Sequence, residues 1–291
     1  MQRRKDLIPP AKNIDIIMAD PASHAQDATA FHVPELLVPG GAIELPIIPL
    51  GFYDLQLTKY MVIEVMVAVS LVAVFLPLAG MIKTGRPPKG RFWNLFEVFL
   101  IFVRDEIARP MIGKKDAGPY LPFLWTLFFF VLFCNLFGMI PWLGSPTGSI
   151  GTTALLAVIT FGVVVFSGMR HHGPVKFWIG LVPHMKLPLI LAIFLKPLLF
   201  CIEVFAFFVK HCVLAIRLWA NLFAGHVVLA VFLSFIAASA GSATWLWGTV
   251  TVLSIIMSLG ISLLELLVAF LQAYIFTFLA ALYIGGAIHQ H

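Results

Sequence analysis

The stretch that decides the fold is residues 212–226, which read CVLAIRLWANLFAGH. It holds a single arginine, Arg217, in the middle of an apolar run that extends from about residue 188 to about residue 238. A guanidinium stays charged at any working pH, and placing one at the centre of a bilayer costs about 2.5–3.5 kcal/mol on insertion scales. Arg217 is therefore the first candidate for a functional residue.

The composition is that of an integral membrane protein. Of the 291 residues, 60% are hydrophobic and 11% are charged, whereas a soluble domain carries about 25% charged residues. The net charge of +5 comes from cations in the loops between apolar runs, so these cations are topology signals and not a footprint for nucleic acid. Cys134, Cys201 and Cys212 lie in apolar runs without paired spacing, so we expect neither a disulfide framework nor a metal site.

Five apolar stretches are long enough to cross a hydrocarbon core of about 30 Å, which takes roughly 20 helical residues. They cover approximately residues 59–81, 119–143, 150–169, 188–238 and 243–288. Residues 91–109 place apolar side chains such as Phe96 and Val103 on one side and polar ones such as Arg91 and Glu97 on the other, which favours an interfacial amphipathic helix. The predicted fold class is an all-α integral membrane protein with about five crossing helices and this one interfacial helix.

The last two apolar stretches are about twice as long as a bilayer requires. A helix of about 42 residues from Pro197 to Ser239 would measure roughly 60 Å. Two such helices joined by the short turn at 239–243 cannot both stand upright, because ordinary tilts near 20° absorb only a few residues. We expect a strongly tilted antiparallel hairpin, or alternatively two shorter helices in each stretch with a break near Gly225 or Gly260.

Loop charges predict the orientation. The connections at 82–118 and 170–187 are rich in Lys and Arg, whereas those at 144–150 and 239–243 have none. The positive-inside rule places the first two connections and the C-terminus in the cytoplasm. Residues 1–54 are then a polar N-terminal extension on the periplasmic side, without the apolar core of a signal peptide, residues 55–288 are the membrane domain, and 289–291 are a tail.

Helical geometry sorts the few polar residues of the hairpin by face. At 100° per residue, Glu203, Arg217 and Asn221 lie within about 40° of one another, whereas His226 is about 180° from Arg217. On the second helix a polar stripe occupies an arc of about 80° over roughly 27 Å, which predicts a water or proton path. Its members are Ser254, Ser258, Ser262, Glu265 and Gln272.

Each of these groups also has a structural interpretation. Isolated intramembrane serines usually bond to their own backbone, and His226 fits a neutral packing role. Arg217 and Glu265 could neutralise each other in an internal salt bridge. Three further ionisable residues could form a structural ion cluster, or their side chains could extend to a membrane interface. They are Glu203, Lys210 and His211.

Hydrolytic or covalent chemistry is not expected of this chain. It contains no phosphate-binding glycine loop, nucleophile elbow or metal-hydrolase spacing. His171 and His172 are adjacent, so they point in different directions and suit a solvated loop better than a metal site. We expect no cofactor and no metal.

Two of these segments resemble subunit a of the F-type ATP synthase: RLWANLFAGH at 217–226 and LLELLVAFLQAYIFT at 263–277. The resemblance extends through NLFGMIP at 135–141 and the five-span layout, so it covers roughly residues 55–288. It implies a stator that holds a ring of c subunits against the tilted hairpin at 188–288, with two offset aqueous half-channels. It also implies peripheral-stalk b subunits and the lipid bilayer as partners, and no nucleic acid.

The resemblance also implies a role for each matching residue. Arg217 matches the essential arginine that faces the rotor carboxylate, Asn221 and Gln272 match polar positions near it, and Glu203 matches an acidic position toward the cytoplasmic exit. His226 and Glu265 resemble the swapped form of a pair that many bacterial members carry as Glu and His. The polar stripe adds Ser258 and Ser262 to the expected proton path, while Gly138 departs from family members with an acidic residue at that place.

The expected function is proton translocation in a bacterial plasma membrane, with the mitochondrial inner membrane as the alternative. A secondary ion-coupled transporter would also place an arginine and a carboxylate at the midplane, but it should show internal repeats and discontinuous helices. A structural anchor without an ion path is the third possibility.

Overall fold

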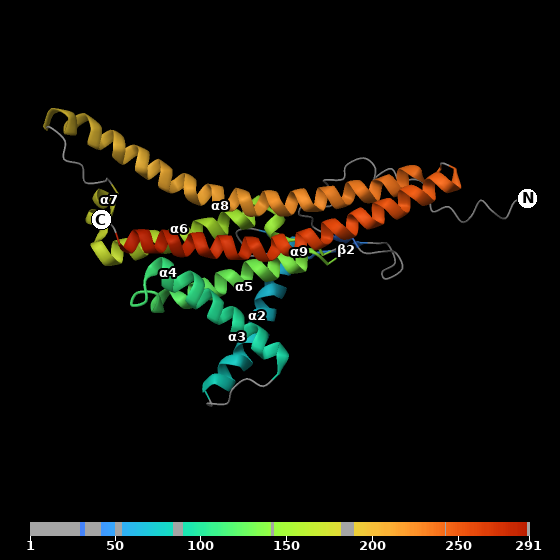
Figure 1. Cartoon of the computed structure of the whole chain (residues 1–291), viewed down its shortest axis with the longest axis horizontal. Coiled ribbons are helices and arrows are strands. Elements are labelled where there is room, and N and C mark those ends of the chain that lie inside the picture. Colours follow the sequence, from blue (N-terminus) through green and yellow to red (C-terminus); the bar gives the residue numbers. More distant parts are fainter. Residues whose placement is uncertain are drawn as a thin grey trace, which may run out of the picture.

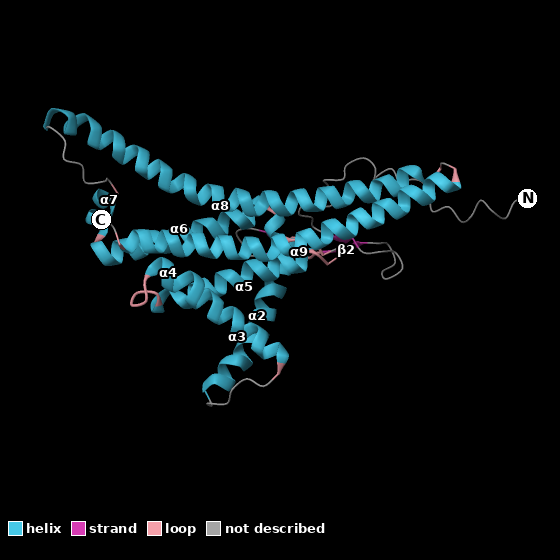
Figure 2. Cartoon of the chain, in the orientation of Figure 1, coloured by secondary structure: helices cyan, strands magenta, loops and turns pink. Residues whose placement is uncertain are grey.

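The computed structural model describes residues 30–32, 42–49, 54–83, 90–140, 143–181, 189–241 and 243–289. Within these residues the chain begins with two short antiparallel ribbons and is otherwise helical (Figure 2). Strand β1 (Ala30–His32) pairs with β2 (Ala42–Glu44), and β3 (Ile47–Pro49) pairs with β4 (Asp54–Gln56). The ribbons fall almost entirely in the predicted extension and lie before the first membrane span.

In the described part of the chain, five helices are long and apolar enough to cross a membrane. They are α2 (Lys59–Lys83), α5 (Leu121–Gly138), α6 (Ile150–His172), α8 (Leu189–Ser239) and α9 (Thr244–Ile288). Short helices connect them: η3 (Gly118–Tyr120), η4 (Pro146–Gly148) and α7 (Pro174–Gly180). The predicted all-α membrane fold is confirmed, although the second span ends at Gly138 and not near residue 143, because the backbone N–H groups of Met139 and Ile140 donate to carbonyl oxygens three residues back and form a turn.

Helices α8 and α9 form one antiparallel hairpin (Figure 1). They contain 51 and 45 residues, or about 76 Å and 68 Å of rise. A straight rod of about 68 Å fits within a bilayer of 40–45 Å only at roughly 50° from the membrane normal. Both helices are unbroken, so the alternative with breaks near Gly225 or Gly260 is wrong. Helix α8 also begins before Pro197, because a membrane helix tolerates the one backbone hydrogen bond that a proline removes.

A helix over the predicted stretch 91–109 is confirmed, with a wider turn in its second half, whereas its position at a membrane interface stays a prediction. Helix α3 (Arg91–Phe102) continues through the π-helical turn η2 (Val103–Ala108) into α4 (Arg109–Ile112). Phe96 and Val103 are buried, whereas Arg91 and Glu97 are exposed. The helix therefore binds the bundle through its apolar side.

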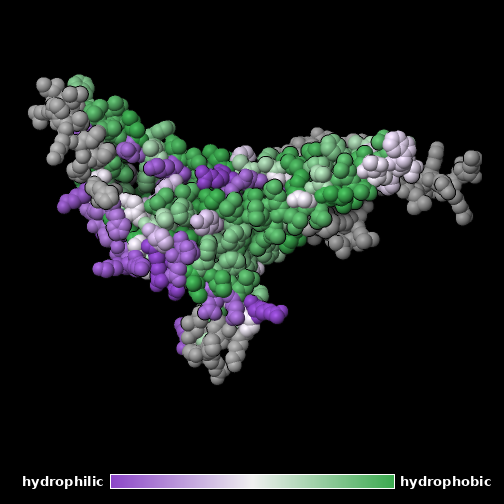
Figure 3. Space-filling model, in the orientation of Figure 1, coloured by the Kyte–Doolittle hydropathy of each residue, from purple (hydrophilic) through white to green (hydrophobic). Residues whose placement is uncertain are grey.

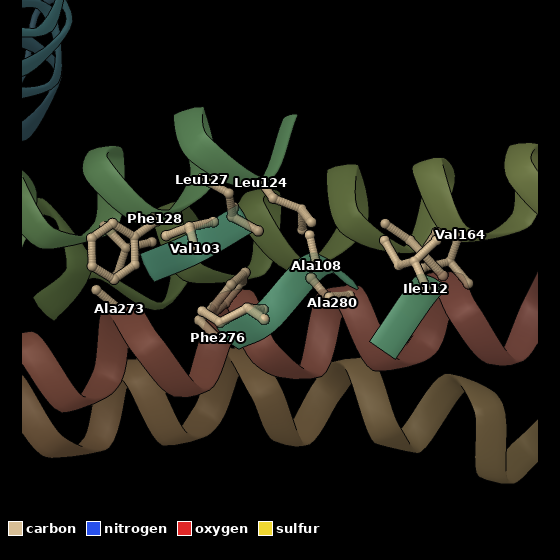
Figure 4. Packing of buried hydrophobic residues seen from close by; sticks show 14 of the residues in the cluster. Val103, Ala108, Ile112, Leu124, Leu127, Phe128, Val164, Ala273, Phe276 and Ala280 are labelled. Carbon is tan, nitrogen blue, oxygen red and sulfur yellow. The ribbon is translucent and has the colours of Figure 1, made fainter. Parts of the chain in front are cut away.

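The core lies where η2 and α4 meet α5, α6 and α9 (Figure 4). Val103, Ile112, Phe128 and Ala280 have no exposed surface. At Gly285 a Cβ would overlap the backbone carbonyl oxygen of Met111. Small residues let the helix backbones approach closely. This packing holds the C-terminal half of α9 against α4, while the other half extends with α8 to the tip of the hairpin (Figure 1).

Candidate functional site

Arg217 lies on the outer surface of α8. Its side chain is exposed, as are those of Ala220 and Asn221, whereas Leu218 and Leu222 on the other side of the helix are buried. Figure 3 shows a hydrophilic patch over α8 within a largely hydrophobic surface. An outward-facing guanidinium at membrane depth can bind an anionic group of a neighbouring molecule.

Arg217 has no counter-charge within the described part of the chain. None of the ion pairs there includes it, so the internal salt bridge with Glu265 is not formed. Tyr283 of α9 is close enough for the charge of Arg217 to act on it. The guanidinium of Arg217 therefore lies near the phenol of Tyr283 on a largely apolar surface.

Glu265 of α9 faces inward, against α8. Its side chain is 7% exposed. It rests on the backbone of Gly225, where a Cβ would overlap the carboxylate oxygen and lie 2.9 Å from Cδ. Gly225 therefore provides the space that Glu265 occupies, and His226 is the next residue of α8. The structure therefore places Glu265 against the residue before His226, while Glu265 Oε1 and His226 Nε2 have no hydrogen-bond partner among the described residues.

A line of buried polar atoms without partners leads to this contact. Among the described residues, such atoms include Oε1 of Glu265, Nε2 of His226, Oγ of Ser258 and Oγ1 of Thr251. Buried polar atoms normally have a partner, and ordered water often serves. Each of these four atoms therefore lacks a protein partner among the described residues and could bond to an ordered water molecule.

The path follows one face of α9 at a spacing of seven residues. Thr251, Ser258, Glu265 and Gln272 are each seven apart, and seven residues return a helix to within about 20° of the same direction. The row spans about 32 Å of the helix. Thr251 extends the predicted stripe, and its spacing of seven residues from Ser258 is the feature of the sequence that indicates it. Ser254 is buried and Ser262 is half-buried on the same helix.

A second polar network adjoins the path on the side of α5. The Asn135 amide Nδ2 donates to the carbonyl oxygen of Ala269, one turn beyond Glu265, at 3.2 Å. The Thr147 hydroxyl donates to Asn135 Oδ1 at 2.7 Å and lies 2.7 Å from the Ser145 hydroxyl. Asn135, Ser145 and Thr147 are all at most 1% exposed. The loop at 144–150 thereby connects to the helix that carries Glu265.

This network also explains why position 138 is occupied by a glycine. A Cβ on Gly138 would overlap Cβ of Ser145 and lie 2.8 Å from its hydroxyl oxygen. The space that an acidic side chain would need is therefore filled by a hydroxyl of the neighbouring loop.

The remaining predicted residues are spread along the hairpin. Glu203 is half-buried near the start of α8, and Gln272 is 5% exposed within the bundle. Lys210 is exposed, whereas His211 is 3% exposed and contacts the rings of Phe161 and Tyr283. The interpretation of His211 as a residue that reaches an interface is wrong, because its Nδ1 bonds the Phe207 carbonyl oxygen inside the bundle.

These features define the class: an integral membrane protein whose described residues include five long apolar helices, a row of polar side chains on the last of them, and an exposed arginine without a counter-charge among those residues. Comparison with known proteins gives the family. The family model described as ATP synthase A chain matches residues 61–285.

Three bacterial relatives, each named ATP synthase subunit a, match most of this chain. The one from Myxococcus xanthus is 35% identical over 294 residues, or 97% of this chain and 92% of the relative. The one from Chloroherpeton thalassium is 38% identical over 253 residues, or 86% and 72%. The one from an Anaeromyxobacter species is 35% identical over 264 residues, or 89% of this chain but only 62% of the longer relative. The chain belongs to the ATP synthase A chain family.

Proposed function

We propose that this chain is the stationary proton-conducting subunit of a rotary ATP synthase, and that Arg217 acts on a carboxylate of the rotor. The observation that carries the proposal is the outward position of Arg217 without a counter-charge among the described residues. Charged side chains at membrane depth normally face a bundle interior or a partner. Exposed Ala220 and Ala224 beside it leave room for a second helix to approach closely.

The chemistry follows from the charge of the guanidinium. A rotor carboxylate surrounded by lipid must be protonated, because a bare anion there is very costly. A fixed guanidinium stabilises the ionised form and lowers the pKa of that carboxylate. Each carboxylate therefore releases its proton as it approaches Arg217 and takes up another before it returns to lipid. The positive charge also blocks direct proton leakage past the rotor.

His226 and Glu265 form the inlet half-channel in this proposal. They lie on the other side of α8 from Arg217, and Gly225 is eight residues, or about 12 Å, closer to the hairpin tip. An imidazole titrates near neutral pH and can pass protons to and from a neighbouring carboxylate. Thr251, Ser258 and Ser262 connect this pair to the tip, and Gln272 continues the row toward the level of Arg217.

The outlet half-channel lies at the other end of α8. Glu203 is fourteen residues before Arg217, about 21 Å along the helix, and only about 40° round from it. Asn221 is one turn beyond Arg217 on the same exposed face. The two half-channels are thus offset along the helix, which is what converts proton flow into rotation.

We assign the protein to the bacterial plasma membrane, since the relatives described above are bacterial. The hairpin tip and residues 1–54 face the periplasm, and the lysine- and arginine-rich connections face the cytoplasm. The ring of c subunits contacts the exposed side of the hairpin at 188–288, and peripheral-stalk b subunits complete the stator. The unbroken α8 and α9 count against a secondary transporter, whose substrate helices are discontinuous.

The test is ATP-driven proton pumping by the assembled complex in reconstituted vesicles. Arg217→Ala is expected to abolish pumping while the complex still copurifies. Arg170→Ala is the matched control, because this exposed arginine lies at the end of α6 outside the hairpin, and it should pump normally. Full pumping by Arg217→Ala would refute the proposal.

A further inference from the structure

Glu64 is an acidic residue inside the first membrane span for which the proposed mechanism has no use. It lies five residues after Lys59, about 7.5 Å along α2, in a span with a mean hydropathy of 2.5. Its side chain is half-buried. An ionisable group within a membrane helix is costly and is a candidate for function by default.

Glu64 lies where three helices meet. Tyr60, Ile63 and Val67 form the buried face of α2, and Glu64 is at the edge of that face. The Thr152 hydroxyl, at the start of α6, donates a hydrogen bond to Glu64 Oε1 at 2.9 Å. Cys134 of α5 is close enough for the charge of Glu64 to act on it. The carboxylate therefore borders both the solvent end of α6 and the interior.

Polar groups continue from this corner toward the inlet pair. The buried hydroxyls of Ser145 and Thr147 connect through Asn135 to the backbone of Ala269, one turn from Glu265. The side-chain oxygen of Thr58, just before α2, is buried without a partner among the described residues.

Other charged groups, on α2 and α9, lie in the same region between Glu64 and His226. Lys59 lies on α2, where its ammonium would be 3.3 Å from a Cβ on Gly144, and its charge acts on His226 of α8. Glu265 of α9 is the remaining acid of the region. One polar corner, formed by the starts of α2 and α6 and the loop at 144–150, therefore adjoins the inlet.

We propose that Glu64 collects protons at the periplasmic mouth of the inlet and supplies them to His226 and Glu265 through water and the hydroxyls of Thr147 and Ser145, while Thr152 only holds the carboxylate in place. The inference rests on the proposed function. In each cycle the Glu64 carboxylate takes one proton from periplasmic water and releases it inward, so that it returns to its ionised form. A negative group at a channel mouth raises the local concentration of cations and their rate of entry.

The test is the rate of ATP synthesis by the complete complex in vesicles, measured against the proton concentration on the periplasmic side. Glu64→Gln keeps the size of the side chain and the acceptor for Thr152 but removes the charge and the proton site. It should raise the half-saturating proton concentration roughly 10-fold and leave the maximal rate unchanged. Glu64→Asp should behave like the parent, and Glu97→Gln, which removes an exposed acid of α3, is the matched control.

Thr152→Val tests whether Glu64 matters only as a hydrogen-bond acceptor. It removes the hydrogen bond from Thr152 to Glu64 but keeps the charge of the Glu64 carboxylate. A Glu64→Gln complex with the parent's half-saturating concentration would overturn the inference. So would a loss of maximal rate that Thr152→Val reproduces. If Glu64→Gln does not assemble, Glu64→Asn compared with Glu64→Asp repeats the test at equal length. Pumping by Arg217→Ala would defeat the proposed function itself, whereas an inactive Arg217→Ala with an unaffected Glu64→Gln would defeat this inference alone.

Discussion

Gly225→Ala should reduce proton pumping without lowering the stability of the complex. The added Cβ would overlap the Glu265 carboxylate oxygen and lie 2.9 Å from Cδ and 3.1 Å from Cγ. Carbon atoms pack at about 3.5–4.0 Å, so the carboxylate must retreat by about 1 Å. A displacement of that size at a reacting group can reduce the rate about 100-fold, or about 2.7 kcal/mol.

The helix itself should not suffer from the same change. Alanine is more favourable than glycine inside a helix by about 0.5–1 kcal/mol, so the complex should assemble and its thermal stability should not fall. We therefore expect normal copurification together with a loss of ATP-driven pumping of about 10- to 100-fold. Gly162→Ala is the matched control, because a Cβ there meets nothing within 4 Å.

A second substitution tests the cause. Glu265→Asp shortens the side chain by one methylene, about 1.5 Å, so it should restore part of the pumping when combined with Gly225→Ala. Pumping at the parent's rate by Gly225→Ala alone would refute the placement of Glu265 in the proton path. A loss that Glu265→Asp does not relieve would refute the steric explanation.

Three further substitutions test neighbouring parts of the structure. Asn135→Ala should destabilise the protein by about 1–3 kcal/mol, because it leaves buried groups without hydrogen bonds, and thermal unfolding in detergent measures this. Thr251→Val, which keeps the shape but removes the hydroxyl, should slow pumping several-fold without loss of stability, whereas Thr249→Val, on an exposed residue bonded to its own helix, should not. Asp105 has a pKa held below its usual value by the hydrogen bond from Arg104, so its stabilising effect is present above about pH 4 and is lost as the pH falls through the lower folded pKa. Asp105→Asn should therefore reduce the difference in melting temperature between pH 7 and pH 3, and an unchanged difference would show that the ion pair contributes nothing.

The architecture was predictable because it depends on quantities that are local in the sequence. Span lengths follow from hydropathy, and the tilt of α8 and α9 follows from the mismatch between their length and the bilayer. The opposite directions of Arg217 and His226 follow from helical geometry alone. Pro197 misled the prediction of where α8 begins, since sequence rules from soluble proteins overstate its effect in a membrane.

The contacts between helices were not predictable in the same way. That Glu265 rests on Gly225 depends on the register of α8 against α9, which no periodicity within one helix specifies. The burial of His211 depends on Phe161 and Tyr283, which come from two other helices. A single threonine in an apolar run usually bonds to its own backbone, whereas the buried side-chain oxygen of Thr251 has no partner among the described residues.

The central claim is that the Arg217 face of α8 contacts a second subunit that carries a carboxylate. The most direct measurement is disulfide formation in the assembled complex, between single cysteines on α8 and a cysteine beside the rotor carboxylate, with the native cysteines replaced. Val213→Cys and Ala220→Cys lie on the exposed face with Arg217 and should form the crosslink. Crosslinks from Phe208→Cys, about 180° from Arg217, but not from these two positions, would contradict the account.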